Sequence, residues 1–173
     1  MRKDQDSRAF GGRKADGALD LILVIIVLFI MGIVAVTGYK VFDDINQDIQ
    51  SDTTLSNSTK ETSQALYARY PQTMDGAFML AFVLLWGVVL VGAFMLDSHP
   101  IFFVFTLILL IFIVYIGAEI SNFYAEYTGD AELATYAASF PMTNHVIGNI
   151  ATYIILIAAS IGIVTYGKYR MGY

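Results

Sequence analysis

Four long stretches without a charged residue constrain the fold of this chain more than any other feature. They cover residues 21–39, 76–96, 100–118 and 146–167, and each is between 19 and 22 residues long. A helix rises about 1.5 Å per residue, so about 20 apolar residues cross the roughly 30 Å hydrocarbon core of a bilayer. Because only 14% of the 173 residues are charged, the remainder of the chain is too small to enclose four such helices in water. We therefore expect an all-α integral membrane protein with four transmembrane helices.

The sequence divides into a short N-terminal tail and a membrane domain. Residues 1–17 are polar and basic, whereas residues 18–173 carry all four apolar stretches. Spans and acidic outer loops are expected to alternate, with short amphipathic helices in the loops. The predicted spans cover about 19–42, 76–96, 100–124 and 146–168, and the predicted acidic outer loops cover 43–75 and 125–145.

The distribution of basic residues predicts the orientation. Seven Lys and Arg residues lie in the two tails and three lie between the first and second spans. Because basic residues near span ends stay on the cytoplasmic side, both termini should face the cytoplasm or its topological equivalent. The tail residues could also bind lipid head groups or, without sequence preference, nucleic acid, although ordinary anchoring is the favoured explanation. These residues are Arg2, Lys3, Arg8, Arg13 and Lys14.

Apolar residues at helical spacing predict that helices continue beyond the membrane. Val41, Phe42, Ile45 and Ile49 extend the first span among acidic residues. Ser58 and Glu61 have the spacing of a capping box, so a short helix should begin there and stop at Pro71.

Proline and glycine should set the ends of the third helix and of the short helix after it. Pro100 suits the first turn of the third helix, and residues 128–130 (Thr-Gly-Asp) should end it. A short amphipathic helix is expected next, ending before Pro141, with its apolar face packed on the outer helix ends or lying in the membrane interface. That face consists of Leu133, Tyr136, Ala137 and Phe140.

Ionisable residues are absent from the middles of the four stretches, which argues against an ion-coupled transporter or an intramembrane protease. The feature closest to a functional site is a polar cluster on the outer side of the membrane. Either these side chains form a functional carboxylate–imidazole pair, or they satisfy one another and the helix ends. The cluster consists of Glu119, Asn122, His145 and Asn149. The chain has no cysteine, and we predict no catalytic residue, no metal ligand and no cofactor.

Small residues on the last span predict close helix packing. Gly148 and Thr152 are four residues apart, as are Ala158 and Gly162. In lipid, helices associate where small residues let their backbones approach. These positions could serve the bundle itself or an oligomer, and the sequence leaves both open.

Residues 97–103 (Asp-Ser-His-Pro-Ile-Phe-Phe) and 139–144 (Ser-Phe-Pro-Met-Thr-Asn) carry a resemblance. With the order of tail, span, acidic linker, tight hairpin of two spans, amphipathic piece and last span, the chain resembles small multi-span membrane proteins encoded by phages. The resemblance implies a viral origin and a place in the internal membrane of an icosahedral virion. It transfers no functional residue.

The resulting expectation is a non-enzymatic structural protein of a virion membrane that links a lipid vesicle to a capsid. Its partners would be the lipid bilayer, further copies or neighbouring capsid and membrane proteins, and the genome through the basic tail. Two alternatives remain at this point. The chain could be a holin-like pore former, or it could be an accessory subunit of a larger membrane complex.

Overall fold

The structure, a computed structural model, describes residues 16–95 and 100–171. These residues form helices and turns without a strand, which confirms the all-α prediction. Four helices of the described ranges, α1, α2, α3 and α6, are long and apolar enough to span a membrane. The six helices are α1 (Asp16–Ser51), α2 (Asn57–Met95), α3 (Pro100–Thr128), α4 (Ala134–Ala137), α5 (Pro141–Gly148) and α6 (Ile150–Met171).

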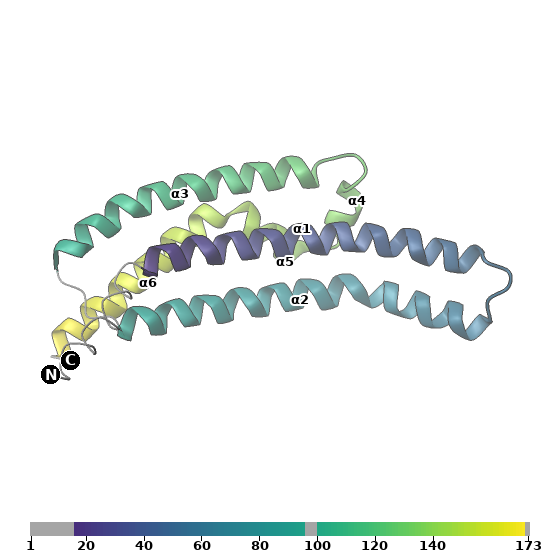
Figure 1. The fold of residues 1–173 in the computed structure, drawn as a ribbon, viewed down its shortest axis with the longest axis horizontal. Helices are drawn as coiled ribbons and strands as arrows, with labels where there is room; N and C mark the ends of the chain where they lie inside the picture. The colour runs from purple at the N-terminus through teal and green to yellow at the C-terminus, as the bar shows by residue number, and fades with distance from the viewer. Residues whose placement is uncertain (1–15, 96–99, 172–173) are drawn as a thin grey trace, which may run out of the picture.

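The four long helices form an antiparallel bundle in which each contacts two neighbours. The first two lie side by side along their whole length, α3 packs on α6, and the ring closes through contacts of α2 with α6 and of α1 with α3. The start of α1 and the end of α6 lie at one end of the bundle (Figure 1). Toward the stalk, α4 packs on α1, and α5 packs against α1, α2 and α3.

The α1–α2 hairpin projects beyond the rest of the molecule (Figure 1). Side-chain contacts between Asn46 and Gln64, and between Gln50 and Lys60, fix its register. Counting from these contacts, Lys40 lies at the height of Tyr70 and Ala35 at the height of Asp75. We call residues 40–51 and 57–70, with the turn 52–56, the stalk. Twelve residues of α1 give the stalk a length of about 18 Å.

The stalk corrects the predicted outer loop at 43–75, because only residues 52–56 lie outside helices there. The expected helical continuation of the first span is confirmed to Ser51. The cap of α2 lies earlier than predicted, at Ser56 rather than Ser58. The Thr59 N–H donates to Ser56 Oγ at 3.3 Å and to the Ser56 carbonyl at 3.1 Å.

The prediction that Pro71 ends a helix is wrong, because α2 continues through it from Asn57 to Met95. Proline lacks the N–H that would bond to the Tyr67 carbonyl, which weakens the helix locally. The neighbouring helix supplies the compensation. Tyr67 and Tyr70, which both lie in the turn before Pro71, stack on Tyr39 of α1, with ring centroids 5.1 and 5.7 Å away.

The third helix is described from Pro100, next to residues 96–99 outside the described ranges, and it ends at Thr128 as predicted. The amphipathic segment after it is shorter than expected, since α4 has four residues. Its apolar face nevertheless packs where predicted: Ala137 and Phe140 are buried against Ala35 and Val36 of α1. Pro141 begins the next helix, α5, in its first turn.

The last span is interrupted at Asn149, so the continuous span predicted for residues 146–168 is corrected to α5 followed by α6. Asn149 has φ −122° and ψ 24°, outside the helical region. The interruption lets α5 run between α1, α2 and α3 before α6 turns along α3 and α2. Gly32 of α1 makes this approach feasible, because a side chain there would meet Ile147 and Thr143 of α5.

Candidate functional site

Asp75 of α2 and Thr143 of α5 form a buried polar site, in which Asp75 is 5% exposed. Its carboxylate accepts hydrogen bonds from the N–H groups of Met142 and Thr143, at 3.0 and 2.8 Å. The Thr143 hydroxyl donates a third bond, at 2.8 Å. All three donors belong to the first turn of α5, so Asp75 caps that helix from a distance.

This capping arises because α5 cannot cap itself. The residue before it is Phe140, which has no side-chain acceptor, and Pro141 contributes no N–H. The free N–H groups at a helix start attract negative charge, so a carboxylate there is stabilising. The sequence places Asp75 only at the end of a span. The one local signal is the uncapped start at Phe140-Pro141, and it does not identify the partner.

A second buried chain of hydrogen bonds holds α3 and α4 to α5. The Tyr124 hydroxyl donates to Asn144 Oδ1 at 2.8 Å, and Asn144 Nδ2 donates to the Ala137 carbonyl at 2.7 Å. Tyr124 is 2% exposed and packs against Leu28 and Phe78. The first turns of α5 are therefore fixed to α2, α3 and α4 at once.

The predicted outer polar cluster is only partly assembled. Asn149 Nδ2 donates to the His145 carbonyl at 2.8 Å, while the His145 ring lies edge-on to Tyr153. Glu119 and Asn122 are exposed on α3. Within the described part of the chain, Glu119 and His145 form no ion pair.

The broken helix at Asn149 explains the polar groups that do meet. The Ser121 hydroxyl donates to the Gly148 carbonyl at 2.7 Å, and Asn149 satisfies His145 one turn earlier. Both bonds satisfy carbonyls at the end of α5 that lack a partner in the helix. This arrangement corresponds to the alternative in which polar side chains satisfy helix ends.

The predicted packing residues of the last span face outward or sit at the edge. Gly148 and Thr152 are exposed, Ala158 and Gly162 are half-buried, and a side chain at either glycine would meet no atom within 4 Å. Close approach inside the bundle occurs instead at Gly117 of α3. A side chain there would meet Ile154 and the Ala151 backbone of α6. The tail residues Arg2, Lys3, Arg8, Arg13 and Lys14 lie outside the described residues.

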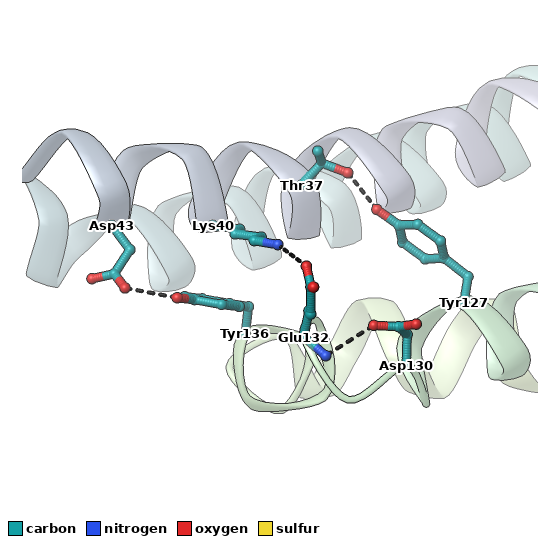
Figure 2. A network of polar contacts seen from close by, with 7 residues as sticks. All are labelled: Thr37, Lys40, Asp43, Tyr127, Asp130, Glu132 and Tyr136. Atoms are coloured by element: carbon teal, nitrogen blue, oxygen red, sulfur yellow. Dashed lines mark hydrogen bonds and ion pairs between the residues drawn. The ribbon is translucent and has the colours of Figure 1, made fainter.

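Polar contacts connect α1 near the base of the stalk to the end of α3, to the turn that follows it and to α4 (Figure 2). Lys40 forms an ion pair with Glu132, and the Thr37 and Tyr127 hydroxyls are hydrogen-bonded. The Tyr136 hydroxyl donates to Asp43 at 2.7 Å. This bond raises the pKa of Tyr136 to about 12, because it is lost when the phenol ionises next to a carboxylate.

An aromatic cluster fills the inner side of this junction. Tyr39 stacks on Tyr67 and Tyr70, and it meets Tyr136 and Phe140 edge-on. Gly38 gives the Tyr70 hydroxyl its space on α1. Aromatic residues of α1, α2, α4 and the segment before α5 therefore pack on one another and join the stalk to the bundle.

Polar side chains also hold the stalk together above the cluster. Asn46 is 5% exposed, donates to Gln64 Oε1 at 3.0 Å and accepts from the Ser63 hydroxyl at 2.8 Å. Nearer the tip, Gln50 Nε2 donates to the Lys60 carbonyl at 2.9 Å, and Lys60 Nζ donates to the Gln50 carbonyl at 2.8 Å. The stalk is therefore a specifically paired element that can hold its tip at a defined distance from the bundle.

Residues 16–95 and 100–171 contain no group of three or more His, Asp or Glu side chains arranged to hold a metal ion. Comparisons with protein-family models, with curated proteins and with solved structures find no match to this chain. The helical, multi-pass architecture and the stalk are thus the features on which a functional interpretation rests.

Proposed function

We propose that this chain is a non-enzymatic structural protein of a virion membrane, in which the stalk links the lipid vesicle to the capsid. The observation that carries the proposal is the length and specific pairing of the stalk. Four helices hold the protein in the bilayer, while α1 and α2 continue together for about 18 Å beyond Lys40 and Tyr70. A paired hairpin of this kind suits a spacer between two surfaces.

The proposed orientation places the stalk on the capsid side and both termini on the inner, cytoplasm-equivalent side. The stalk carries Asp43, Asp44, Asp48, Asp52 and Glu61 against three basic residues. Near the tip, the hydroxyl and N–H of Thr54 lower the pKa of Asp52 by hydrogen bonding to its carboxylate. The acidic stalk would face a shell protein, and the basic N-terminal tail would face the packaged genome.

The first test is mass spectrometry on density-gradient fractions from cells that produce the chain in its native genetic context. The proposal expects it to band with particles that contain both lipid and nucleic acid. Confinement to host membrane fractions would contradict the virion role. Dye leakage from liposomes that contain the purified chain would then separate a holin-like pore former from an accessory subunit.

A shortened stalk gives the second test. Residues 44–50 and 60–66 face each other in the hairpin, so deleting both removes two turns from each helix and leaves the contacts of Tyr39 with Tyr67 and Tyr70 to hold the pairing. The proposal expects the shortened chain to enter membranes normally but to be depleted from particles. Gln47→Ala, at an exposed position of the stalk, serves as a control that keeps the stalk at full length. Equal incorporation of the shortened and full stalks would show that the stalk does not contact the shell.

A further inference from the structure

The outer end of the stalk carries the triplet Asn57-Ser58-Thr59. Asparagine, followed by any residue except proline and then by serine or threonine, is the acceptor sequence for N-linked sugars. Among the five asparagines of the chain, only Asn57 lies in such a triplet, and the others are Asn46, Asn122, Asn144 and Asn149. A triplet is short enough to arise by chance, so its position in the structure decides whether it is a usable acceptor.

Asn57 lies where a glycan meets no obstacle. It is the first residue of α2, directly after the turn 52–56, and it is exposed. Side chains of a helix lean toward its N-terminus, so the Asn57 side chain points toward the tip of the stalk. Its carboxamide forms no hydrogen bond with the residues that the structure describes. A glycan there would break no contact of the stalk, and its bulk would extend into solvent.

The stalk also holds the triplet away from the membrane. Asn57 lies 18 residues after Tyr39, which ends the first apolar stretch, and 19 residues before Gly76, which begins the second. The start of α1 and the end of α6 lie at the opposite end of the molecule (Figure 1). Enzymes that attach N-linked sugars act above the membrane surface on the translocated side. The orientation proposed above places Asn57 on that side, and the inference rests on this orientation rather than on the virion role.

We propose that Asn57 is a glycosylation site, which an oligosaccharyltransferase of the producing cell modifies with a lipid-linked sugar phosphate as donor. The Nδ2 atom of Asn57 attacks C1 of the sugar, and a C–N bond forms as the bond from C1 to the phosphate oxygen breaks. The amide nitrogen loses one proton to a base of the enzyme, and the lipid phosphate leaves. The transfer is not a redox step, so it needs no co-reactant besides the lipid-linked sugar.

The cap of α2 indicates when the transfer takes place. The acceptor sequence requires the Thr59 hydroxyl, which in the folded stalk is hydrogen-bonded to Ser56 Oγ at 2.9 Å. The Thr59 N–H donates to the same oxygen at 3.3 Å. A hydroxyl held in this cap is not available to the enzyme, so the transfer precedes the folding of the first turn of α2. Ser56→Ala, which removes the cap, should therefore leave the glycosylated fraction undiminished.

Mass spectrometry of the full chain from the cells that naturally produce it tests the site. Trypsin releases Asn57 in the peptide 41–60, because no Lys or Arg lies between Lys40 and Lys60. This peptide should carry the added mass of sugar residues. Asn57→Gln and Thr59→Val should abolish the added mass, whereas Thr59→Ser keeps the acceptor sequence and should retain it. Asn122→Gln, at an exposed asparagine outside any acceptor triplet, is the control. An unmodified parent peptide, or added mass that persists in Asn57→Gln, would overturn the proposal.

A second measurement separates the site from the orientation on which it rests. The chain contains no cysteine, so Thr53→Cys provides a single thiol in the turn of the stalk. A membrane-impermeant maleimide should label this thiol from outside in sealed, right-side-out vesicles of the producing cells. Labelling together with an unmodified peptide 41–60 would overturn the glycosylation site and leave the orientation and the virion role standing. Labelling only after lysis would overturn the orientation and the site together.

Discussion

The stalk and the membrane bundle are built from the same two helices, yet they are held together by different means. In the stalk, α1 and α2 are joined by Asn46, Ser63 and Gln64 and by the Gln50–Lys60 pair. In the bundle, buried isoleucines such as Ile25, Ile113 and Ile154 fill the centre while most of the outer surface is apolar.

The difference follows from the solvent. Water drives apolar side chains together outside the membrane, so polar bonds and aromatic stacking there mainly fix the register. Lipid provides no such drive, and the helices depend on close backbone approach and on internal hydrogen bonds. Gly32 and Gly117 supply the approach, and Asp75 supplies the hydrogen bonds. If this interpretation is correct, substitutions in the bundle should affect global stability and those in the stalk should act locally.

The largest effect is expected from Asp75→Ala. The variant removes three hydrogen bonds and leaves buried N–H groups of α5 without an acceptor, so the free energy of unfolding should fall by about 3 kcal/mol. Asp75→Asn keeps one acceptor and should lose less. Reversible unfolding in mixed micelles measures both variants against Asp48→Ala, which alters an exposed stalk carboxylate. A stability of Asp75→Ala equal to that of Asp48→Ala would show that α5 does not depend on this cap.

A smaller global effect is expected at Gly117. Gly117→Ala places a methyl group against Ile154 and the Ala151 backbone, and the overpacking should reduce the free energy of unfolding by about 1–3 kcal/mol. Gly87→Ala is the matched control, because a side chain there meets nothing within 4 Å. The same unfolding assay compares the two. If both glycines tolerate alanine equally, close contact of α3 with α6 is not what holds the bundle.

Asn46→Ala should produce a local effect in the stalk. It removes the hydrogen bonds of a buried amide and should cost about 1 kcal/mol. Hydrogen exchange read by mass spectrometry should speed up in residues 40–51 and 57–70 and stay unchanged in α3 and α6. Gln47→Ala, at an exposed position of the same helix, is the control. Faster exchange throughout the bundle would contradict the separation of the two regions.

The smallest effect is expected from Glu132→Ala. The Lys40–Glu132 pair lies at the surface, where solvent and salt screen the attraction. Exchange around α4 should rise only slightly at low ionic strength, and the difference from the parent chain should vanish in high salt. A salt-independent loss of protection would show that this pair, rather than the aromatic cluster around Tyr39, joins the stalk to the bundle.

Local features of the sequence predicted much of the fold. The uncharged stretches predicted four long helices, and residues 128–130 predicted the end of α3. Spacing also predicted the continuation of α1 and the packing face of Ala137 and Phe140. Each of these depends on residues close together in the chain, where helical period and turn chemistry act.

The candidate site could be predicted only in part. The sequence placed Glu119 and His145 together because each lies at a span end, but they form no ion pair in the described part of the chain. It placed packing at Gly148 and Gly162, where a side chain would meet no atom within 4 Å, and it did not identify Gly117, at which α3 closely approaches α6. A small residue marks a place where another helix can approach closely. The arrangement of the other helices decides which of these places is used.

The sequence by itself determined that this chain has four apolar helices, because a helix satisfies its backbone hydrogen bonds within one segment and its length can be counted. The tertiary structure decided that Pro71 stays inside a helix, that the last span breaks at Asn149, and that Asp75 caps a helix 67 residues farther along the chain. These outcomes depend on which side chain from another helix comes near, and that is settled by the packing of the whole bundle.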